Sequence, residues 1–177
     1  SGSISGIRGS TSSSTNGTSR GAIEAIDPPL TGHAGGVNAV AFDQAGKRIV
    51  SGGDDGTVRV WSVADRQQIP LRPMAHDGPV LAVAFSPDGE TIASGGTRAA
   101  VESRAPNGQA ASQKTETVRL WASRTGEPDS RGGFGRRMDK VTSLAFSGND
   151  RIVAGGADGA LRQWNIDGSG PTDRRFD

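Results

Sequence analysis

The sequence predicts an all-β protein built from three similar units, and three observations lead to that prediction. The first is a repeated apolar run that ends in Phe, at 37–42, 80–85 and 141–146. The second is a Gly-Gly pair after each run, followed by an alternating segment that ends in Trp61, Trp121 or Trp164. The third is the set of turn signals between these runs, of which Ser-Pro-Asp-Gly at 86–89 is the clearest. A period of about 43 residues filled with short β-patterned runs is typical of a repeat architecture.

The elements expected along the chain follow from these patterns. Residues 1–20 are mainly Ser, Thr and Gly without a helix or strand period, so we expect a flexible tail there. Residues 22–26 could form one short strand before Asp-Pro-Pro interrupts it. Each unit then supplies three strands: the run ending in Phe, the run leading to Gly-Gly, and the run ending in Trp. A polar stretch after the Trp, such as 67–71, offers a fourth strand.

The second unit is about 17 residues longer than the other two, which places an insertion at about 97–115. Its Ala-, Gln- and Ser-rich composition favours disorder over a functional loop. The repeat segment covers 21–177, with units at about 30–71, 72–130 and 131–170.

Composition excludes several classes of function. The 177 residues include 20 basic and 19 acidic side chains, so the net charge of +1 gives no general attraction to nucleic acid or anionic membrane. Cysteine is absent and there are only two histidines, which removes disulfides, thiolate sites and cysteine catalysis and argues against zinc. The longest apolar run, 80–85, is far shorter than the ~20 residues of a membrane-spanning helix. We therefore expect no cofactor, no metal, no nucleic-acid partner and no membrane attachment.

The three units resemble repeats of the WD-repeat (WD40) β-propeller family over about 30–167. In that family a Gly-His lies near the start of each repeat and a Trp-Asp ends its third strand; here Ser62, Ala122 and Asn165 replace that Asp. The resemblance implies three four-stranded antiparallel blades, each with its outermost strand supplied by the neighbouring repeat. A propeller closes with roughly four to eight blades, so three leave an incomplete ring or one completed by oligomerisation.

The resemblance also assigns a structural hydrogen-bond network to the polar residues of the units. The first unit has the full set, and the second has a Thr115 where the Asp belongs, while the third has Arg137 for the His and Ala154 for the Ser. The network residues are His33, Ser51, Asp55 and Trp61, then His76, Ser94 and Trp121, then Asp158 and Trp164. The same Ser, His and Asp types would also suit a hydrolase triad, an alternative that the residues alone leave open.

A partner-binding rim is implied for one end of the blades. Asn38, Leu81 and Thr142 hold equivalent positions just inside the first strand of each unit, and the insertion adds Arg98 and Arg104 to the same rim. The basic cluster at 131–140 is interpreted as a solvated loop, because Phe134 alone offers a stacking surface for nucleic-acid bases.

We predict a non-catalytic protein–protein interaction scaffold with a protein partner of unknown identity. The alternative is a sensor or regulatory segment of a larger bacterial signalling ATPase or kinase, with the catalytic domain outside this chain. A third hypothesis is hydrolysis at His33 and Ser51. The start at Ser1 rather than Met favours a fragment of a larger propeller over a homo-oligomer. No basic stretch precedes an apolar core, so we expect no signal peptide and a cytoplasmic location.

Overall fold

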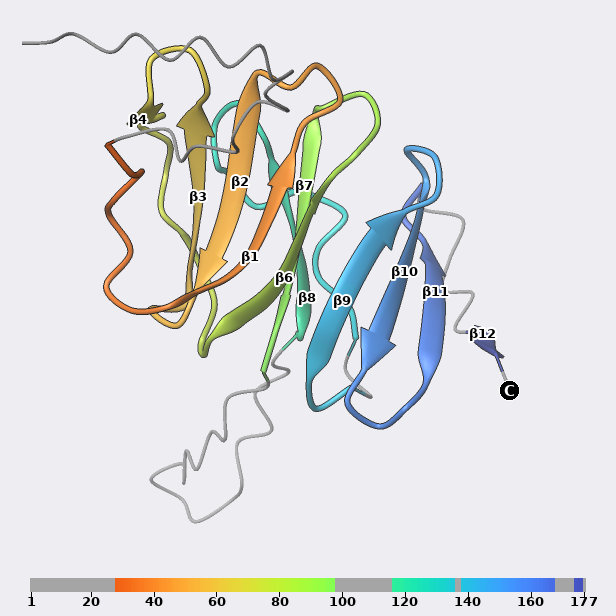
Figure 1. Ribbon diagram of the computed structural model, residues 1–177. Helices are drawn as coiled ribbons and strands as arrows, with labels where there is room; N and C mark the ends of the chain where they lie inside the picture. Colours follow the sequence, from red (N-terminus) through yellow and green to blue (C-terminus); the bar gives the residue numbers. More distant parts are fainter. Residues whose placement is uncertain (1–27, 98–115, 136–137, 168–173, 177) are drawn as a thin grey trace, which may run out of the picture.

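The computed structural model describes residues 28–97, 116–135, 138–167 and 174–176. Within these ranges every regular element is a β-strand, and the strands form three antiparallel sheets that lie side by side (Figure 1). This confirms the predicted all-β class. Among the described residues, no helix could span a membrane. The predicted tail at 1–20, the strand at 22–26 and nearly all of the insertion at 97–115 lie outside the described residues.

Sheet 1 is formed by the first unit and the residues that follow it. Its strands are β1 (Val37–Phe42), β2 (Arg48–Gly53), β3 (Thr57–Ser62), β4 (Gln67–Gln68) and β5 (Met74–Ala75). They are arranged in the order β1-β2-β3-β4, and β5 also pairs with β3. The fourth strand expected at 67–71 is therefore split into two short pieces. Pro70 and Pro73 lie between them, and proline has no N–H to contribute to a strand ladder.

Sheet 2 differs from the expected four-stranded blade. Its strands are β6 (Val80–Phe85), β7 (Thr91–Gly96) and β8 (Val118–Ala122), in that order. The outer strand is reduced to two isolated bridges, Val118 to Phe134 and Trp121 to Pro128. Pro128 lacks an N–H, and Gly132 and Gly135 have positive φ angles, so this stretch cannot stay extended long enough to form a ladder.

Sheet 3 has four strands, as the family resemblance implies, although its outermost strand lies beyond the predicted end of the third unit at about 170. They are β9 (Val141–Phe146), β10 (Arg151–Gly156), β11 (Leu161–Asn165) and β12 (Arg174–Phe176), with β12 at the outer edge beside β11. The first strands of all three sheets therefore coincide with the three apolar runs that end in Phe.

The hydrophobic core lies between neighbouring sheets. Val80, Val83 and Phe85 of β6 pack against sheet 1, and β9 packs in the same way against sheet 2. The first glycine of the Gly-Gly pair in each of the first two units permits this close approach. A Cβ atom at Gly52 would lie 2.4 Å from Cγ1 of Val80, and one at Gly95 would lie 2.5 Å from Cγ1 of Val141. Gly52 and Gly95 are therefore required by packing between sheets.

Candidate functional site

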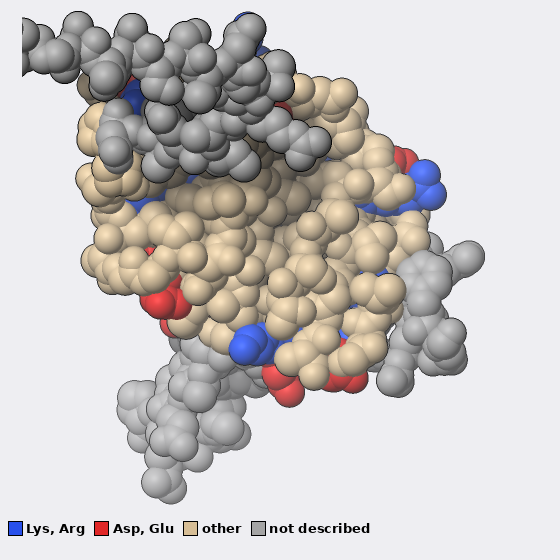
Figure 2. All heavy atoms as spheres, viewed as in Figure 1, with Lys and Arg blue, Asp and Glu red and all other residues tan. Residues whose placement is uncertain are grey.

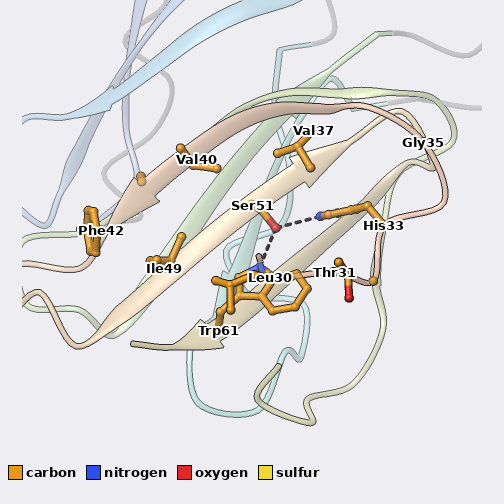
Figure 3. A pocket seen from close by; sticks show the side chains of 12 residues that line it. Leu30, Thr31, His33, Gly35, Val37, Val40, Phe42, Ile49, Ser51 and Trp61 are labelled. Carbon is orange, nitrogen blue, oxygen red and sulfur yellow. Dashed lines mark hydrogen bonds between the residues drawn. The ribbon is translucent and has the colours of Figure 1, made fainter. Parts of the chain in front are cut away.

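The polar set of the first unit forms one hydrogen-bonded chain in sheet 1. The indole Nε1–H of Trp61 donates to Oγ of Ser51 at 2.8 Å. Oγ of Ser51 lies 2.8 Å from Nε2 of His33, and Nδ1 of His33 lies 3.0 Å from both carboxylate oxygens of Asp55. Figure 3 shows Ser51 between the two rings. Residues from the loop before β1, from β2, from the β2–β3 turn and from β3 are thus joined.

The donor and acceptor roles in this chain follow from chemistry. An indole N–H only donates, so Oγ of Ser51 accepts from Trp61. The Asp55 carboxylate only accepts, so Nδ1 of His33 donates to it, and Nε2 of a neutral ring is then the acceptor for the Ser51 hydroxyl. His33 therefore carries its proton on Nδ1 and donates it to Asp55. Burial opposes ionisation of Asp55, but the amides of Ala34 and Thr57 and the side chains of His33 and Thr57 outweigh it and hold the pKa of Asp55 well below its usual range.

Sheet 2 contains three members of the equivalent set. The indole of Trp121 donates to Oγ of Ser94 at 2.7 Å, and the same oxygen lies 2.7 Å from Nε2 of His76. Burial lowers the pKa of His76 to about 4, and the nearby Arg119 guanidinium adds to this effect while Asp77 opposes it. Thr115, which holds the Asp position in the sequence, lies outside the described residues.

In sheet 3 the two remaining residues of the polar set, Asp158 and Trp164, make other contacts than their equivalents in sheet 1. Asp158 accepts from the Ala160 amide at 3.2 Å and from Nη2 of Arg162 at 2.6 Å, and the Arg162 hydrogen bond lowers the pKa of Asp158 to about 2. Ala154 offers no hydroxyl to the ring of Trp164, which packs instead against Phe134 with ring centroids 5.2 Å apart. Asp158 and Trp164 therefore stay in separate contacts.

The first set has the interatomic distances of a Ser-His-Asp triad, so the hydrolase hypothesis can be compared with the geometry. Ser51 is only 3% exposed, and its Oγ already accepts a hydrogen bond from Trp61. The hydrogen bonds give all four side chains their partners, which is what a structural role in a buried position requires.

Asn38, Leu81 and Thr142 are brought to one edge of the molecule by a shared backbone irregularity. The strand pairing shifts register between Val37 and Ala39 and between Val80 and Ala82, and β10 shows the matching shift between Gly155 and Gly156. Each of the three residues is thus the extra residue of a β-bulge, which re-aims its side chain. The bulges lie at the starts of β1, β6 and β9, at the lower edge in Figure 1.

The surroundings of these three residues are mixed in polarity. The exposed Asn38 donates to Oδ1 of Asp54 at 2.8 Å and to the Val80 carbonyl of sheet 2 at 3.1 Å. Oγ1 of the exposed Thr142 donates to the Gly155 carbonyl at 3.2 Å, and Leu81 is half-buried between these two positions in the sheet order. Arg98 and Arg104, also predicted for this rim, lie outside the described residues.

A groove of about 420 Å³ covers the free face of sheet 1, and sequence reasoning missed it. Val37, Val40, Phe42 and Ile49 line it beside the buried Ser51 (Figure 3). Figure 2 shows a largely uncharged described surface in the view of Figure 1, with charged side chains towards its margins. The signal that could have found the groove is that β1 has the same apolar pattern as β6 and β9 without a sheet before it among the described residues.

The described residues contain no group of three or more His, Asp or Glu side chains that could hold a metal ion. Arg131, in the basic cluster, is engaged with protein groups: it donates to Asp129 at 2.6 Å and to Oγ1 of Thr91 at 2.9 Å.

The comparison with family models decides what these sheets are. The model described as WD domain, G-beta repeat, matches residues 27–62, 69–99 and 135–165, together more than half of the chain. The chain belongs to the WD40 repeat family. Each matched WD40 repeat coincides with the first strands of one sheet, so the three sheets are WD40 blades.

Solved structures share the WD40 fold. The WD40 repeats of RRP9 superpose with a TM-score of 0.61 at 20% identity, covering 84% of this chain and 39% of that one. U3-55K gives a TM-score of 0.60 at 21% identity, covering 84% of this chain and 40% of that one.

Curated relatives match over a short stretch of the chain. Ribosome biogenesis protein erb1 of Neurospora crassa is 53% identical over 38 residues, which are 22% of this chain and 5% of the relative. Ribosome biogenesis protein ERB1 of Chaetomium thermophilum is 50% identical over 38 residues, with the same coverage of both chains. The chain thus spans a small fraction of these relatives and about two fifths of the solved WD40 structures.

Proposed function

We propose that this chain is a non-catalytic protein-interaction scaffold whose partner binds the edge formed by the three bulges. The observation that carries the proposal is the repeated bulge at Asn38, Leu81 and Thr142, which presents one equivalent position from each WD40 blade on one edge. A bulge interrupts the regular hydrogen bonds between two strands, and bulges are over-represented where a sheet turns a side chain towards a functional site.

The chemistry of this edge suits a protein partner. It combines an apolar centre, Leu81, with exposed donors and acceptors at Asn38 and Thr142 and opposite charges at Asp54 and Lys140. Protein interfaces have such an apolar centre surrounded by a polar rim. The names of the fungal relatives, ribosome biogenesis proteins, add support for a role in a larger assembly.

Quantitative affinity purification from cells of the source organism tests the proposal. We compare the wild-type chain with Leu81→Arg, which places a charge at the centre of the edge. The matched control is Gln44→Arg, because Gln44 is exposed in the β1–β2 turn at the opposite edge. We expect partners to be lost with Leu81→Arg and kept with Gln44→Arg. Equal recovery with both variants would contradict binding at this edge.

Deletion of 97–115 provides a second comparison, because the insertion is predicted to lie on the same rim. Loss of the same partners as with Leu81→Arg would assign the insertion to the interface, while loss of different ones would make it a separate site.

A cytoplasmic location belongs to this proposal, and imaging of a fluorescent fusion of the full-length gene product tests it. The alternative of a sensor segment attached to an ATPase or kinase stays a prediction. A catalytic domain encoded next to this segment in its gene would favour that alternative.

A further inference from the structure

One carboxylate in sheet 1 collects hydrogen bonds from groups of three different segments. Oδ1 of Asp55 accepts from the Thr57 amide at 3.0 Å and from the Thr57 hydroxyl at 2.8 Å. Oδ2 accepts from the Ala34 amide at 3.0 Å, and Nδ1 of His33 lies 3.0 Å from both oxygens. Nη2 of Arg59 lies 3.8 Å from Oδ2. Asp55 is therefore the common acceptor for two amides, a hydroxyl and an imidazole, with a guanidinium close by.

The same donors recur at the equivalent sequence positions of sheet 2. They are Nδ1 of His76, the amides of Asp77 and Thr117, the Thr117 hydroxyl and the Arg119 guanidinium. The acidic residue does not recur, because Thr115 holds the sequence position of Asp55. Among the described residues, no carboxylate accepts from Nδ1 of His76 or from either amide. Sheet 2 therefore repeats the donors of this arrangement without its acceptor.

The hydroxyl and the guanidinium of this set contact other groups in sheet 2. The Thr117 hydroxyl donates to the Gly135 carbonyl at 2.8 Å. Arg119 donates to the Ala75 carbonyl at 2.5 Å and to Oδ2 of Asp77 at 2.8 Å. The side chains of Arg119 and Asp77 are 29% and 50% exposed, and an ion pair so open to water contributes little stability. Another carboxylate can therefore replace Asp77 beside Arg119 at low cost.

The orientation of the His76 hydrogen follows from the buried Ser94. Oγ of Ser94 accepts from the Trp121 indole at 2.7 Å, and Ser94 is 0% exposed. Among its described contacts, the Ser94 hydroxyl hydrogen has one acceptor, Nε2 of His76 at 2.7 Å. A neutral His76 ring therefore carries its hydrogen on Nδ1, the atom that faces Asp55 in the equivalent ring of sheet 1.

We propose that sheet 2 binds a carboxylate at the place that corresponds to Asp55 of sheet 1. The carboxylate accepts from Nδ1 of His76 and from the amides of Asp77 and Thr117, and the Arg119 guanidinium provides a positive charge beside it. A carboxylate fits this set because its two oxygens only accept hydrogen bonds, as those of Asp55 do. Hydrogen bonds to an ionised acceptor are also stronger than those to a neutral one.

An acidic side chain of the protein partner supplies this carboxylate, and this part of the inference rests on the proposed function. His76 and Asp77 lie in the loop before β6, and Thr117 lies just before β8. Both strands start at the edge formed by the three bulges (Figure 1). A partner that covers Leu81 at this edge therefore meets these donors as well.

Sodium acetate tests the site without the partner. NMR near neutral pH follows the amides of Asp77 and Thr117 while acetate replaces chloride at constant ionic strength. We expect both signals to shift until saturation, because both amides gain a charged acceptor. The amides of Ala34 and Thr57 are the internal control and should not shift, since Asp55 already accepts from them. Equal shifts in the two sheets, or none in sheet 2, would overturn the proposal.

Thr115→Asp supplies the carboxylate from the chain itself. We expect the pKa of His76 to rise from about 4 towards 6.5 in an NMR titration of the ring, because a negative charge favours the imidazolium. The shifts caused by acetate should disappear in this variant. Thr115→Asn, which matches Asp in size without its charge, should leave the pKa of His76 low and keep the acetate shifts. An unchanged pKa of His76 in Thr115→Asp would contradict the inferred geometry.

Affinity purification with the same pair of variants tests whether the partner is the source. We expect the partners that are lost with Leu81→Arg to be lost with Thr115→Asp as well, and to be kept with Thr115→Asn. Retention of those partners by Thr115→Asp would overturn a partner carboxylate. Failure of the proposed function is distinguishable, because Leu81→Arg would then keep its partners while acetate still shifts the amides of sheet 2.

Discussion

Replacement of Ser51 by Ala tests whether the buried hydrogen bonds stabilise sheet 1. The substitution removes the acceptor of the Trp61 indole and the donor to Nε2 of His33, both at 2.8 Å. Each buried polar group left without a partner costs about 1–3 kcal/mol. Both rings line the open groove on sheet 1, so water can reach them and the cost falls at the lower end. We expect the free energy of unfolding to drop by about 2 kcal/mol.

The matched substitution in sheet 2 should cost more. Ser94 is 0% exposed, and its partner Trp121 is buried in the core between sheets 1 and 2, away from the groove on the free face of sheet 1. Because water does not replace the lost hydrogen bonds there, we expect Ser94→Ala to lower the free energy of unfolding by about 3 kcal/mol or more. The negative control is Ser62→Ala, whose hydroxyl bonds Asp65 at the surface and should change stability by less than about 0.5 kcal/mol.

The assay is guanidinium-induced unfolding followed by tryptophan fluorescence and circular dichroism, with midpoints and slopes compared across the three variants. An unchanged free energy of unfolding in Ser51→Ala would refute the reasoning. A loss in Ser62→Ala equal to that in Ser51→Ala would refute it as well, because the effect would then be unrelated to burial.

Three further predictions concern neighbouring features. Asp55→Ala removes the acceptor shared by His33 and two backbone amides and should cost about 1–3 kcal/mol; unchanged denaturant midpoints would count against the network. Because burial lowers the pKa of His76 to about 4 from 6.5, the unfolded chain takes up this proton first as the pH falls. The free energy of unfolding should therefore fall by up to about 3 kcal/mol as the pH decreases from 6.5 towards 4, and above pH 6.5 this contribution is fully present. His76→Gln should flatten that part of the stability–pH curve, and parallel curves for both proteins would disprove the assignment. Gly95→Ala forces a methyl group against Val141 and should cost about 1–3 kcal/mol in thermal or chemical unfolding. The cost should exceed that of Gly155→Ala, where one hydroxyl can rotate away, and the reverse order would contradict the packing.

The sequence predicts the inner strands well because their signals are local. Valine at the start and phenylalanine at the end of each run match the bounds of β1, β6 and β9, and the turn at 86–89 has its glycine at the positive φ of 72° that the turn requires. The resemblance to the WD40 family placed Ser, His, Asp and Trp in one network, but only distances show which atoms meet.

Other features depend on pairing between elements and could not be predicted from single runs. The bulges at Asn38, Leu81 and Thr142 are properties of two strands in register, and nothing in either strand alone marks them. The outer strand of sheet 2 is lost through the combined effect of Pro128 and two glycines with positive φ. Phe42 and Phe85 have the same sequence context, yet Phe42 is exposed and Phe85 is buried. The difference arises because a neighbouring sheet covers Phe85 and no described sheet covers Phe42.

The number of hydrogen-bonded side chains in the polar network falls from sheet 1 to sheet 3. This predicts the order in which the three sheets unfold locally. Sheet 1 links four side chains, sheet 2 links three described ones, and in sheet 3 Trp164 rests on a ring contact without a serine beneath it. In stacked repeats each unit is held by its own contacts and by those of its neighbours, so the least connected unit opens first. The backbone amides of β10 and β11 therefore exchange their hydrogens with solvent ahead of those in β2 and β3. We therefore expect sheet 3 to open before sheets 1 and 2.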